Sequence, residues 1–304
     1  SYIQVEYPFN EYHEATDELM DAVGFNYGNF SNYDKAHQDH PDWFIYGSEN
    51  ASAISSRGYY YHPENDWHTG KHPEDMQLSS YDNDCVGWGS PAWYALKNDR
   101  DRKWLGGLFI WTGFDYLGEA PYGWPSKTAQ FGVVDTCGFP KDTYYLYQSQ
   151  WRSVEDYPMV HILPHWNWAD DHSIEIDGKI PVRIYSNAPS VELFLNGKSL
   201  GKQSFVQKVT DYGMPYQESE DDKLWLQWLV PFEEGTIVAK AYDENGTVIA
   251  EDTMSTAGEP AALKLMPESE VITANGEDLC YIPVDVVDEN GVMVPDADNY
   301  IQFS

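Results

Sequence analysis

The sequence predicts a multidomain fold: the last three βα units of an eight-stranded (β/α)8 TIM barrel, followed by all-β immunoglobulin-like sandwiches. Before residue 157, apolar strand-like runs recur and end in Gly, aromatic and acidic residues. After residue 157, short alternating runs separated by turn residues replace them. The predicted domains are residues 1–156, 157–257 and 258–304. A chain of 304 residues is long enough for two or three domains that each have their own core.

Three runs of the first domain are predicted as buried strands. They are residues 22–28 (AVGFNYG), 43–48 (WFIYGS) and 105–116 (LGGLFIWTGFDY). Glu49 directly follows the second run. Because the C-terminal ends of barrel strands carry the catalytic groups, Glu49 is a candidate nucleophile or acid. The alternative is a solvated Glu that begins the next segment.

The other two runs end in side chains that suit a sugar site. Asn26 and Tyr27 end the first run, and Trp111 and Asp115 lie in the third. Carboxylates supply the chemistry of such a site, aromatic rings contact the CH face of the sugar, and amides bind its hydroxyls. These neighbouring strand ends favour the catalytic interpretation of Glu49.

The segments between the strands are predicted as helices and rim loops. In chain order they are a helix at 11–21, a crossing helix and loop within 29–42, a long polar loop at 58–89, a helix at 90–103, a second rim loop at 117–138 and a closing helix at 141–152. In the first helix, Leu19 and Met20 are expected to turn inward with Ala22. The 58–89 loop is expected to lie over the site.

The second domain is predicted as a β-sandwich from six strand-like runs. These are residues 160–162, 180–185, 191–195, 223–229, 236–242 and 247–253. The dipeptides Asn196-Gly197 and Asn245-Gly246 predict tight hairpins, and the acidic stretch 211–222 is expected to be a loop insertion. After a linker at 258–260, strands at 263–265, 270–272 and 280–287 would begin another sandwich.

Composition narrows the class of protein. The net charge of −32 disfavours nucleic acid and anionic membranes as partners, whereas a neutral sugar is not repelled. The three cysteines, Cys85, Cys137 and Cys280, are widely spaced and are expected to be buried or free thiols. No run approaches the ~20 apolar residues of a membrane span. The sequence does not determine the compartment: a soluble, bacterial-type enzyme is expected, which would be either cytoplasmic or secreted.

Several motifs carry a resemblance to a known family. They are residues 24–28 (GFNYG), 47–58 (GSENASAISSRG), 108–119 (LFIWTGFDYLGE), 131–135 (FGVVD), 138–141 (GFPK) and 144–151 (YYLYQSQW). Together they resemble the β-galactosidases of glycoside hydrolase family 2, over essentially the whole chain. The resemblance implies a C-terminal fragment: the end of the barrel, then immunoglobulin-like domains. It also implies hydrolysis of terminal β-galactosides with no organic cofactor.

The resemblance implies roles for individual residues. Glu49 matches the nucleophile, and Tyr27 matches the position whose hydroxyl hydrogen-bonds it. Trp111 matches the Trp on which the galactose ring stacks. The alternatives are a packed strand-end Tyr and a plain core Trp. Asp115 and Glu119 would either hold sugar hydroxyls or cap their loop.

The second carboxylate of the reaction is not evident. The family's acid/base is the Glu of an Asn-Glu pair that lies three strands before the nucleophile. Asn10-Glu11 is the only such pair upstream of Glu49, and Glu11 lies only 38 residues before Glu49. Three βα units need roughly 25 to 30 residues each. The general acid is therefore expected outside this chain, and the chain alone is expected to be inactive.

The remaining expectations concern partners, metals and rival functions. Three strands cannot close a barrel, so a missing N-terminal part or another copy of the chain should cover the exposed edges. The resemblance implies Mg²⁺ or Na⁺ near the site without identifying ligands. Surface histidines are the simpler interpretation of the pairs His37/His40 and His68/His72. The rival functions are β-glucuronide hydrolysis, for which the rim motifs contain few basic groups, and a non-catalytic carbohydrate-binding or structural module.

Overall fold

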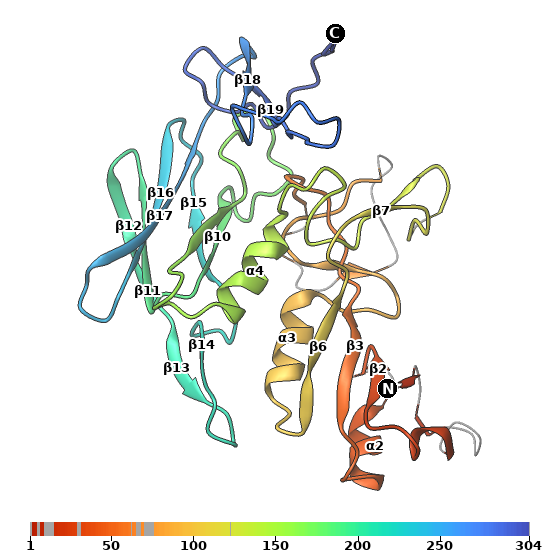
Figure 1. The fold of residues 1–304 in the computed structure, drawn as a ribbon. Helices are drawn as coiled ribbons and strands as arrows, with labels where there is room; N and C mark the ends of the chain where they lie inside the picture. The colour runs from red at the N-terminus through yellow and green to blue at the C-terminus, as the bar shows by residue number, and fades with distance from the viewer. Residues whose placement is uncertain are drawn as a thin grey trace.

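The computed structural model describes residues 2–4, 7–8, 15–28, 32–61, 63–64, 68–69, 76–121 and 123–303. The chain is mostly β-sheet with few helices (Figure 1). Within these described residues, none of the helices has the length and apolar character needed to cross a membrane.

The first part of the chain is built on a parallel sheet. Its strands are β1 (Tyr2–Gln4), β2 (Val23–Asn26), β3 (Ile45–Ala51) and β6 (Leu105–Trp111), in the order β1-β2-β3-β6. All three pairings are parallel. The three predicted strands are confirmed. Strand β1 was not predicted, because its residues show no clear alternation.

One face of this sheet is covered by helix α2 (Tyr33–Asp39). Val23, Phe25 and Ile45 pack there against Tyr33 and Ala36, and all five side chains are at most 2% exposed. This apolar cluster explains why the strands are β-branched and aromatic at alternate positions. The crossing helix predicted within 29–42 is thus confirmed.

The opposite face of the sheet carries aromatic side chains that remain open to solvent. Phe44 is 54% exposed and Phe109 is 66% exposed. The Tyr46 ring lies between them, 6.5 Å from Phe44 and 6.0 Å from Phe109. Gly24 faces the same side, because a Cβ there would lie 2.7 Å from the Tyr46 ring. Apolar side chains of this size are usually covered in a folded protein.

The helix predicted at 11–21 is only partly observed. Residues 11–14 lie outside the described part, and residues 15–17 form a single helical turn. Leu19 is 84% exposed and Met20 is 39% exposed, so the prediction that they turn inward is wrong. The turn ends before an apolar face could form, which leaves both side chains in solvent.

Helices α3 (Ala92–Arg100) and α4 (Asp142–Trp151) lie between the parallel sheet and the β-sandwich (Figure 1). Both were predicted, with ends one to three residues wider. The buried carboxylate of Asp82 accepts hydrogen bonds from the backbone N–H groups of Ala92 and Trp93, at 2.9 and 2.8 Å. It satisfies two first-turn donors of α3. Burial raises the pKa of Asp82 to about 7.

The predicted rim loop at 58–89 is largely an interior segment. Among its described residues, Leu78 and Tyr81 are fully buried, and it contains the short strands β4 (His68–Thr69) and β5 (Asp84–Cys85). Arg183 of the sandwich donates to the carbonyl of Tyr81 at 2.7 Å. The expectation of a polar rim loop was therefore wrong for most of the described residues of the segment, where the sandwich satisfies backbone carbonyls such as that of Tyr81.

Two antiparallel sheets form the second part of the chain. One has the order β15-β10-β9, comprising β15 (Leu226–Val230), β10 (Ile180–Ser186) and β9 (Val160–Leu163). The other has the order β12-β11-β16-β17, comprising β12 (Lys198–Ser204), β11 (Ser190–Leu195), β16 (Thr236–Tyr242) and β17 (Val248–Ser255). Their inner side chains join those of α3 and α4 in one hydrophobic core, so the core crosses the predicted boundary at residue 157.

In the second part of the chain, the turns were predicted better than the number of strands. Asn196 (φ 51°) and Gly197 (φ 77°) form a two-residue hairpin turn between β11 and β12, as expected. The loop at Asn245-Gly246 is longer, spanning residues 243–247. The loop predicted at 211–222 is wrong in part, because it contains β14 (Pro215–Glu218), which pairs with β13 (Val206–Val209).

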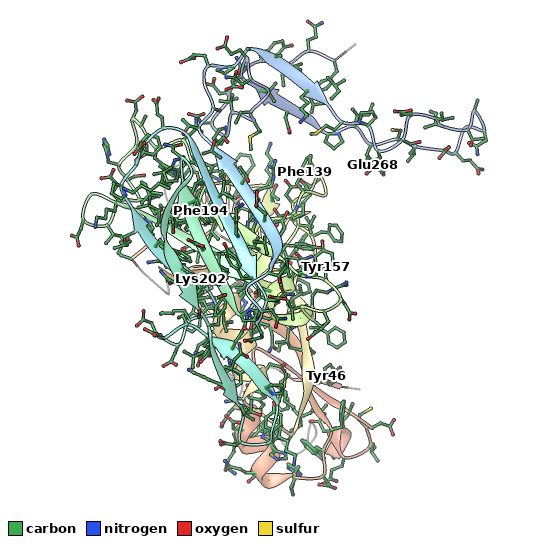
Figure 2. All side chains as sticks on the ribbon, turned by 90° about the vertical axis from the view of Figure 1, so that its left-hand side faces the viewer. Tyr46, Phe139, Tyr157, Phe194, Lys202 and Glu268 are labelled. Atoms are coloured by element: carbon green, nitrogen blue, oxygen red, sulfur yellow. The ribbon has the colours of Figure 1, made fainter. Side chains whose placement is uncertain are left out.

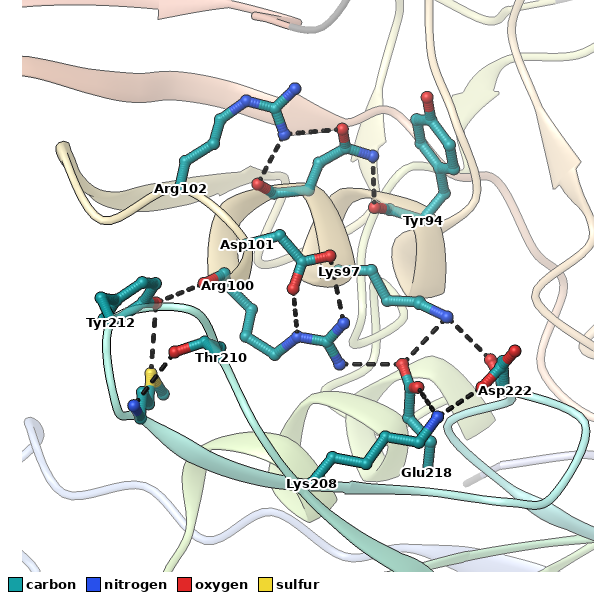
Figure 3. A network of polar contacts seen from close by, with 12 residues as sticks. Tyr94, Lys97, Arg100, Asp101, Arg102, Lys208, Thr210, Tyr212, Glu218 and Asp222 are labelled. Atoms are coloured by element: carbon teal, nitrogen blue, oxygen red, sulfur yellow. Dashed lines mark hydrogen bonds and ion pairs between the residues drawn. The ribbon is translucent and has the colours of Figure 1, made fainter.

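A network of charges attaches the β13–β14 hairpin to α3 (Figure 3). The Glu218 carboxylate, 4% exposed, lies 2.9 Å from the cationic groups of Lys97, Arg100 and Lys208. Burial raises the pKa of Glu218, but hydrogen bonds from these three cations outweigh this effect and lower the pKa to about 2. One carboxylate thus links residues more than a hundred positions apart in sequence.

The last part of the chain is a small unit around β18 (Ala262–Leu265) and β19 (Val284–Val287). Figure 2 shows it extending from the sandwich, with Glu268 and Tyr46 near opposite ends of the molecule. The strand predicted at 270–272 is not observed, and the one predicted at 280–287 is shortened to its last four residues. The turn at 289–291 is present, since Asp288 N–H bonds the carbonyl of Val292 at 2.9 Å.

The first prediction concerns Asp82 and pH. Because its pKa of about 7 in the folded protein exceeds the ordinary 3.8, the folded state binds the proton more tightly, and its stability falls as pH rises from about 4 to 7. In Asp82→Asn this loss, on the order of 4 kcal/mol, should disappear. Unfolding measured from pH 4 to 8 checks it, and parallel curves for both proteins would contradict it.

The second prediction concerns Glu218. Glu218→Gln should destabilise the chain by about 1–3 kcal/mol, because three cations lose a charged acceptor. Since the folded pKa is lowered, the difference from wild type should be present above pH 4.5 and vanish toward pH 2. Glu220→Gln, at an exposed position nearby, is the matched control. Equal unfolding midpoints for the two variants at pH 7 would refute the prediction.

Candidate active site

Shifts in strand register surround Glu49 on both sides of β3. Asn26 of β2 lies opposite Glu49 of β3, and the β2–β3 register shifts between Phe25 and Asn26. The β3–β6 register shifts between Ile45 and Gly47 and again between Gly47 and Asn50. Such bulges turn side chains away from the regular alternation. Gly47 has no room for a side chain here, since a Cβ would lie 2.5 Å from the Asn50 amide.

Tyr27 holds one oxygen of the Glu49 carboxylate. The Tyr27 hydroxyl donates to Glu49 Oε2 at 2.9 Å, and the Tyr27 N–H donates to the Glu49 carbonyl at 2.6 Å. Burial raises the pKa of Tyr27 well above its ordinary value, so the hydroxyl keeps its proton at neutral pH. Among the described residues, none donates to Glu49 Oε1. The structure thus brings together the two residues that the sequence paired.

Two further side chains lie at the Tyr27 hydroxyl, and the sequence did not reveal either. Ser52 Oγ donates to the Tyr27 oxygen at 2.8 Å. The Trp88 indole lies close enough to this oxygen to oppose the rise in the pKa of Tyr27. Ser52 is fully buried, whereas Trp88 is 55% exposed. Trp88 lies at the end of the segment predicted as a rim loop. Its aromatic character within a Gly-rich stretch (VGWG) was the signal that could have identified it.

Asn26 lies beside Glu49 at the end of β2. The Ser48 hydroxyl donates to Asn26 Oδ1 at 2.8 Å. This bond orients the side-chain amide so that its NH₂ group points away from Ser48. An amide in this position is chemically suited to a hydroxylated ligand at the open face.

Trp111 ends β6 and packs against Tyr116. Their ring centroids are 6.1 Å apart in an edge-to-face arrangement. Strand β7 (Tyr116–Leu117) begins there and pairs with β8 (Thr128–Ala129) within the second predicted rim loop. Burial, the hydrogen bond to Glu119 and the charge of Glu49 contribute to raising the pKa of Tyr116 to about 12. The Tyr116 hydroxyl donates to Glu119 at 2.7 Å.

Asp115 has an interior role in this structure. Its carboxylate pairs with Lys141 Nζ at 2.8 Å and accepts the Gly132 N–H at 2.8 Å. The Asp115 side chain is 8% exposed and that of Lys141 is 1% exposed. Burial raises the pKa of Asp115 and lowers that of Lys141. Of the two roles that the sequence left open, this geometry favours the loop anchor over the sugar ligand.

The remaining candidates do not form a second site within the described chain. Glu11 lies outside the described residues. His37 stacks on Trp104 at 4.3 Å and His40 on Trp43 at 3.8 Å, so both act in packing. In the described residues, no three His, Cys, Asp or Glu side chains cluster as metal ligands would. Cys85, Cys137 and Cys280 are free thiols, as predicted.

The arrangement suits nucleophilic chemistry on a neutral ligand. One carboxylate oxygen of Glu49 is held by a neutral donor, and the other is free to form a bond. An aromatic ring and an amide lie at adjacent strand ends. This is the set of groups that a sugar site uses.

Comparisons with known proteins show what the chain is similar to. Residues 177–250 match a family described as a domain of unknown function (DUF4982), and residues 263–304 match glycoside hydrolase family 2 C-terminal domain 5. The chain is 39% identical over 294 residues to beta-galactosidase BoGH2A of Bacteroides ovatus, covering 94% of this chain and 32% of that protein.

The chain is also similar to two other glycosidases. A putative beta-glucuronidase of Formosa agariphila is 38% identical over 229 residues, covering 74% of this chain and 20% of that protein. The crystal structure of a beta-glycosidase from Bacteroides vulgatus superimposes with a TM-score of 0.74 at 28% identity, covering 95% of this chain and 40% of that one. The chain thus spans about a third of the length of the first of these curated relatives.

The third prediction separates the two roles of Asp115. Lys141→Met should destabilise the chain by about 3–5 kcal/mol, because it leaves the Asp115 carboxylate buried without a cation. The double variant Asp115→Asn/Lys141→Met should recover most of this loss. Thermal unfolding of the three proteins checks it. If Asp115 acts only on ligand, the single variant would unfold at the wild-type temperature.

Proposed function

We propose that this chain, which belongs to glycoside hydrolase family 2, carries the nucleophile side of a retaining β-galactosidase active site. The observation that carries the proposal is the Glu49 carboxylate near the end of a parallel strand, held through Oε2 by Tyr27, with no donor to Oε1 among the residues that the structure describes. The motif around Glu49 and the identity to a relative named as a beta-galactosidase support it.

In this proposal the parallel sheet is the end of a (β/α)8 barrel. Strands β2, β3 and β6 would be its last three strands, with α2, α3 and α4 as outer helices. Residues 157–257 would form an immunoglobulin-like sandwich, and residues 258–304 would begin a second one. The parallel pairing of the strands and their polar C-terminal ends support this assignment.

The proposed reaction proceeds in two displacements. Glu49 Oε1 bonds to the anomeric carbon while the glycosidic C–O bond breaks, and the leaving oxygen takes a proton from a general acid. Water then releases galactose from Glu49, giving its proton to the same acid/base group. Trp111 would support the apolar face of the ring, and Asn26 would bind a hydroxyl.

The general acid is proposed to come from another part of the protein. The open aromatic face around Phe44 and Phe109 supports this, because apolar side chains of this size are usually covered in a folded protein. Barrel strands preceding this chain, or a second copy, would cover those rings and bring the acid to Glu49. The chain by itself would then bind but not hydrolyse its substrate.

The nearest rival is hydrolysis of β-glucuronides, the activity in the name of the Formosa agariphila relative. A glucuronide carboxylate needs a free cation at the site. Two cations from this rim are engaged: Lys141 pairs with Asp115 at 2.8 Å and Arg57 with Asp135 at 2.9 Å. This pairing favours the neutral galactoside. The non-catalytic module has no comparable support.

The fourth prediction tests the nucleophile in the full-length protein. A 2-deoxy-2-fluoro-galactoside should label Glu49, because the fluorine slows release of the covalent intermediate. Glu49→Gln should lower hydrolysis of a chromogenic β-galactoside by ~10³-fold or more. Peptide mapping locates the label.

Two controls accompany this test. A chromogenic β-glucuronide offered to the same protein separates the two substrate classes, and faster turnover of it would favour the rival. A label on a residue other than Glu49 would overturn the assignment. The isolated 304-residue chain should show no turnover of either substrate.

A further inference from the structure

We propose that Ser52 and Trp88 are positioning residues that fix the proton of Tyr27 on Glu49. The inference rests on the proposed function, because it concerns the same carboxylate. It starts from the hydrogen bonds at the Tyr27 hydroxyl, which accepts from Ser52 at 2.8 Å and donates to Glu49 Oε2 at 2.9 Å, with the Trp88 indole beside the same oxygen.

The direction of these bonds follows from chemistry. An indole N–H can only donate, and Glu49 as a carboxylate can only accept. The Tyr27 hydroxyl therefore has to turn its hydrogen toward Glu49, and Ser52 has to donate its own. With Ser52 donating to its oxygen and the Trp88 indole beside it, the Tyr27 hydroxyl keeps its proton directed at Glu49. A hydroxyl that accepts hydrogen bonds also donates more strongly.

The backbone is shaped to place Ser52. Ala51 (φ 72°), the last residue of β3, and Ser52 (φ 51°), which follows it, both adopt the left-handed conformation. Two consecutive non-Gly residues in this region are strained, and such strain concentrates at functional sites. The turn reverses the chain, so that Ser52 Oγ contacts the Tyr27 hydroxyl. The same hydroxyl binds Glu49, which lies three residues before Ser52 in the sequence.

The segment carrying Trp88 is fastened to this turn. Ser90 N–H donates to the Ala51 carbonyl at 2.7 Å. Gly89 lies so close that a Cβ would be 2.4 Å from the Ala51 carbonyl and 2.9 Å from Ser52 Cβ. Glycine is required there by this close approach. It holds Trp88, which is 55% exposed, beside the turn that carries Ser52.

The arrangement has a catalytic consequence under the proposed function. Tyr27 holds Oε2 from one side, which keeps the carboxylate rotamer fixed and leaves Oε1 for the bond to the anomeric carbon. Ser52 and Trp88 do not touch the reacting atoms in this structure, so they would act only through Tyr27. Their removal should loosen the carboxylate and slow formation of the covalent intermediate, with little change in substrate binding.

The kinetic test is a double-mutant cycle in the full-length protein. The readout is the rate of labelling by a 2-deoxy-2-fluoro-galactoside, separated into a maximal rate and a half-saturation concentration. Ser52→Ala should lower the maximal rate by about 3- to 10-fold and Tyr27→Phe by about 10- to 100-fold. In the Tyr27→Phe background, Ser52→Ala should have no further effect. Additive losses would overturn the inference.

The pH profile gives a second kinetic readout. The acidic limb of the labelling rate should shift to higher pH in Ser52→Ala, because a weaker donor stabilises the charged carboxylate less. Ser52→Gly should behave like Ser52→Ala without the strain of a left-handed side chain, which covers the case in which the alanine variant folds poorly. Ser149→Ala removes another buried hydroxyl, bonded to the Leu146 carbonyl at 2.7 Å, and should leave rate and profile unchanged.

A spectroscopic test works on this chain without any turnover. With ¹³Cζ-labelled tyrosine, the Tyr27 resonance, assigned by its loss in Tyr27→Phe, should move in Ser52→Ala and in Trp88→Phe and stay in place in Ser149→Ala. An unmoved resonance in both site variants refutes the inference. A moved resonance in a protein that no β-galactoside labels would instead reject the proposed function and leave the contacts standing.

Discussion

Arg183 is the contact on which the arrangement of the two halves depends. Its side chain is 2% exposed, and it donates to the carbonyls of Tyr81 at 2.7 Å and Pro63 at 2.9 Å and to the Gln227 amide at 3.0 Å. The guanidinium also lies over the Tyr81 ring at 4.8 Å and the Trp225 ring at 4.6 Å. A buried cation is tolerated only when its donors are satisfied. Here backbone carbonyls of the 58–89 segment satisfy them.

This contact determines where the 58–89 segment lies, and the segment in turn organises the site. Asp82, next to Tyr81, binds the first turn of α3, which packs behind β3 and β6. Further along, Gly89 and Ser90 contact the turn after Glu49. The sandwich is therefore more than an appendage to the parallel sheet. It supports, through one interior segment, the backbone that positions Glu49 and Trp88.

Structural contacts and the candidate site use different kinds of polar group. The chain carries a net charge of −32, yet its buried and half-buried cations are each used in a specific contact. Lys141 anchors Asp115, and Lys97 and Arg100 meet at Glu218. The site itself presents a carboxylate, an amide, two hydroxyls and aromatic rings. A neutral, hydroxylated ligand fits such a surface better than an anion.

The sequence by itself determined the elements whose signal is local. Three strands followed from apolar alternation, the β11–β12 turn from Asn196-Gly197, and the pairing of Glu49 with Tyr27 from similar strand ends and a family motif. Tertiary structure alone decided the burial of the 58–89 segment, the interior role of Asp115 and the parts of Ser52 and Trp88. Each of these depends on a partner distant in sequence or on a register shift. The sequence pattern around a polar residue is the same whether its hydrogen bonds go to a distant carbonyl or to water.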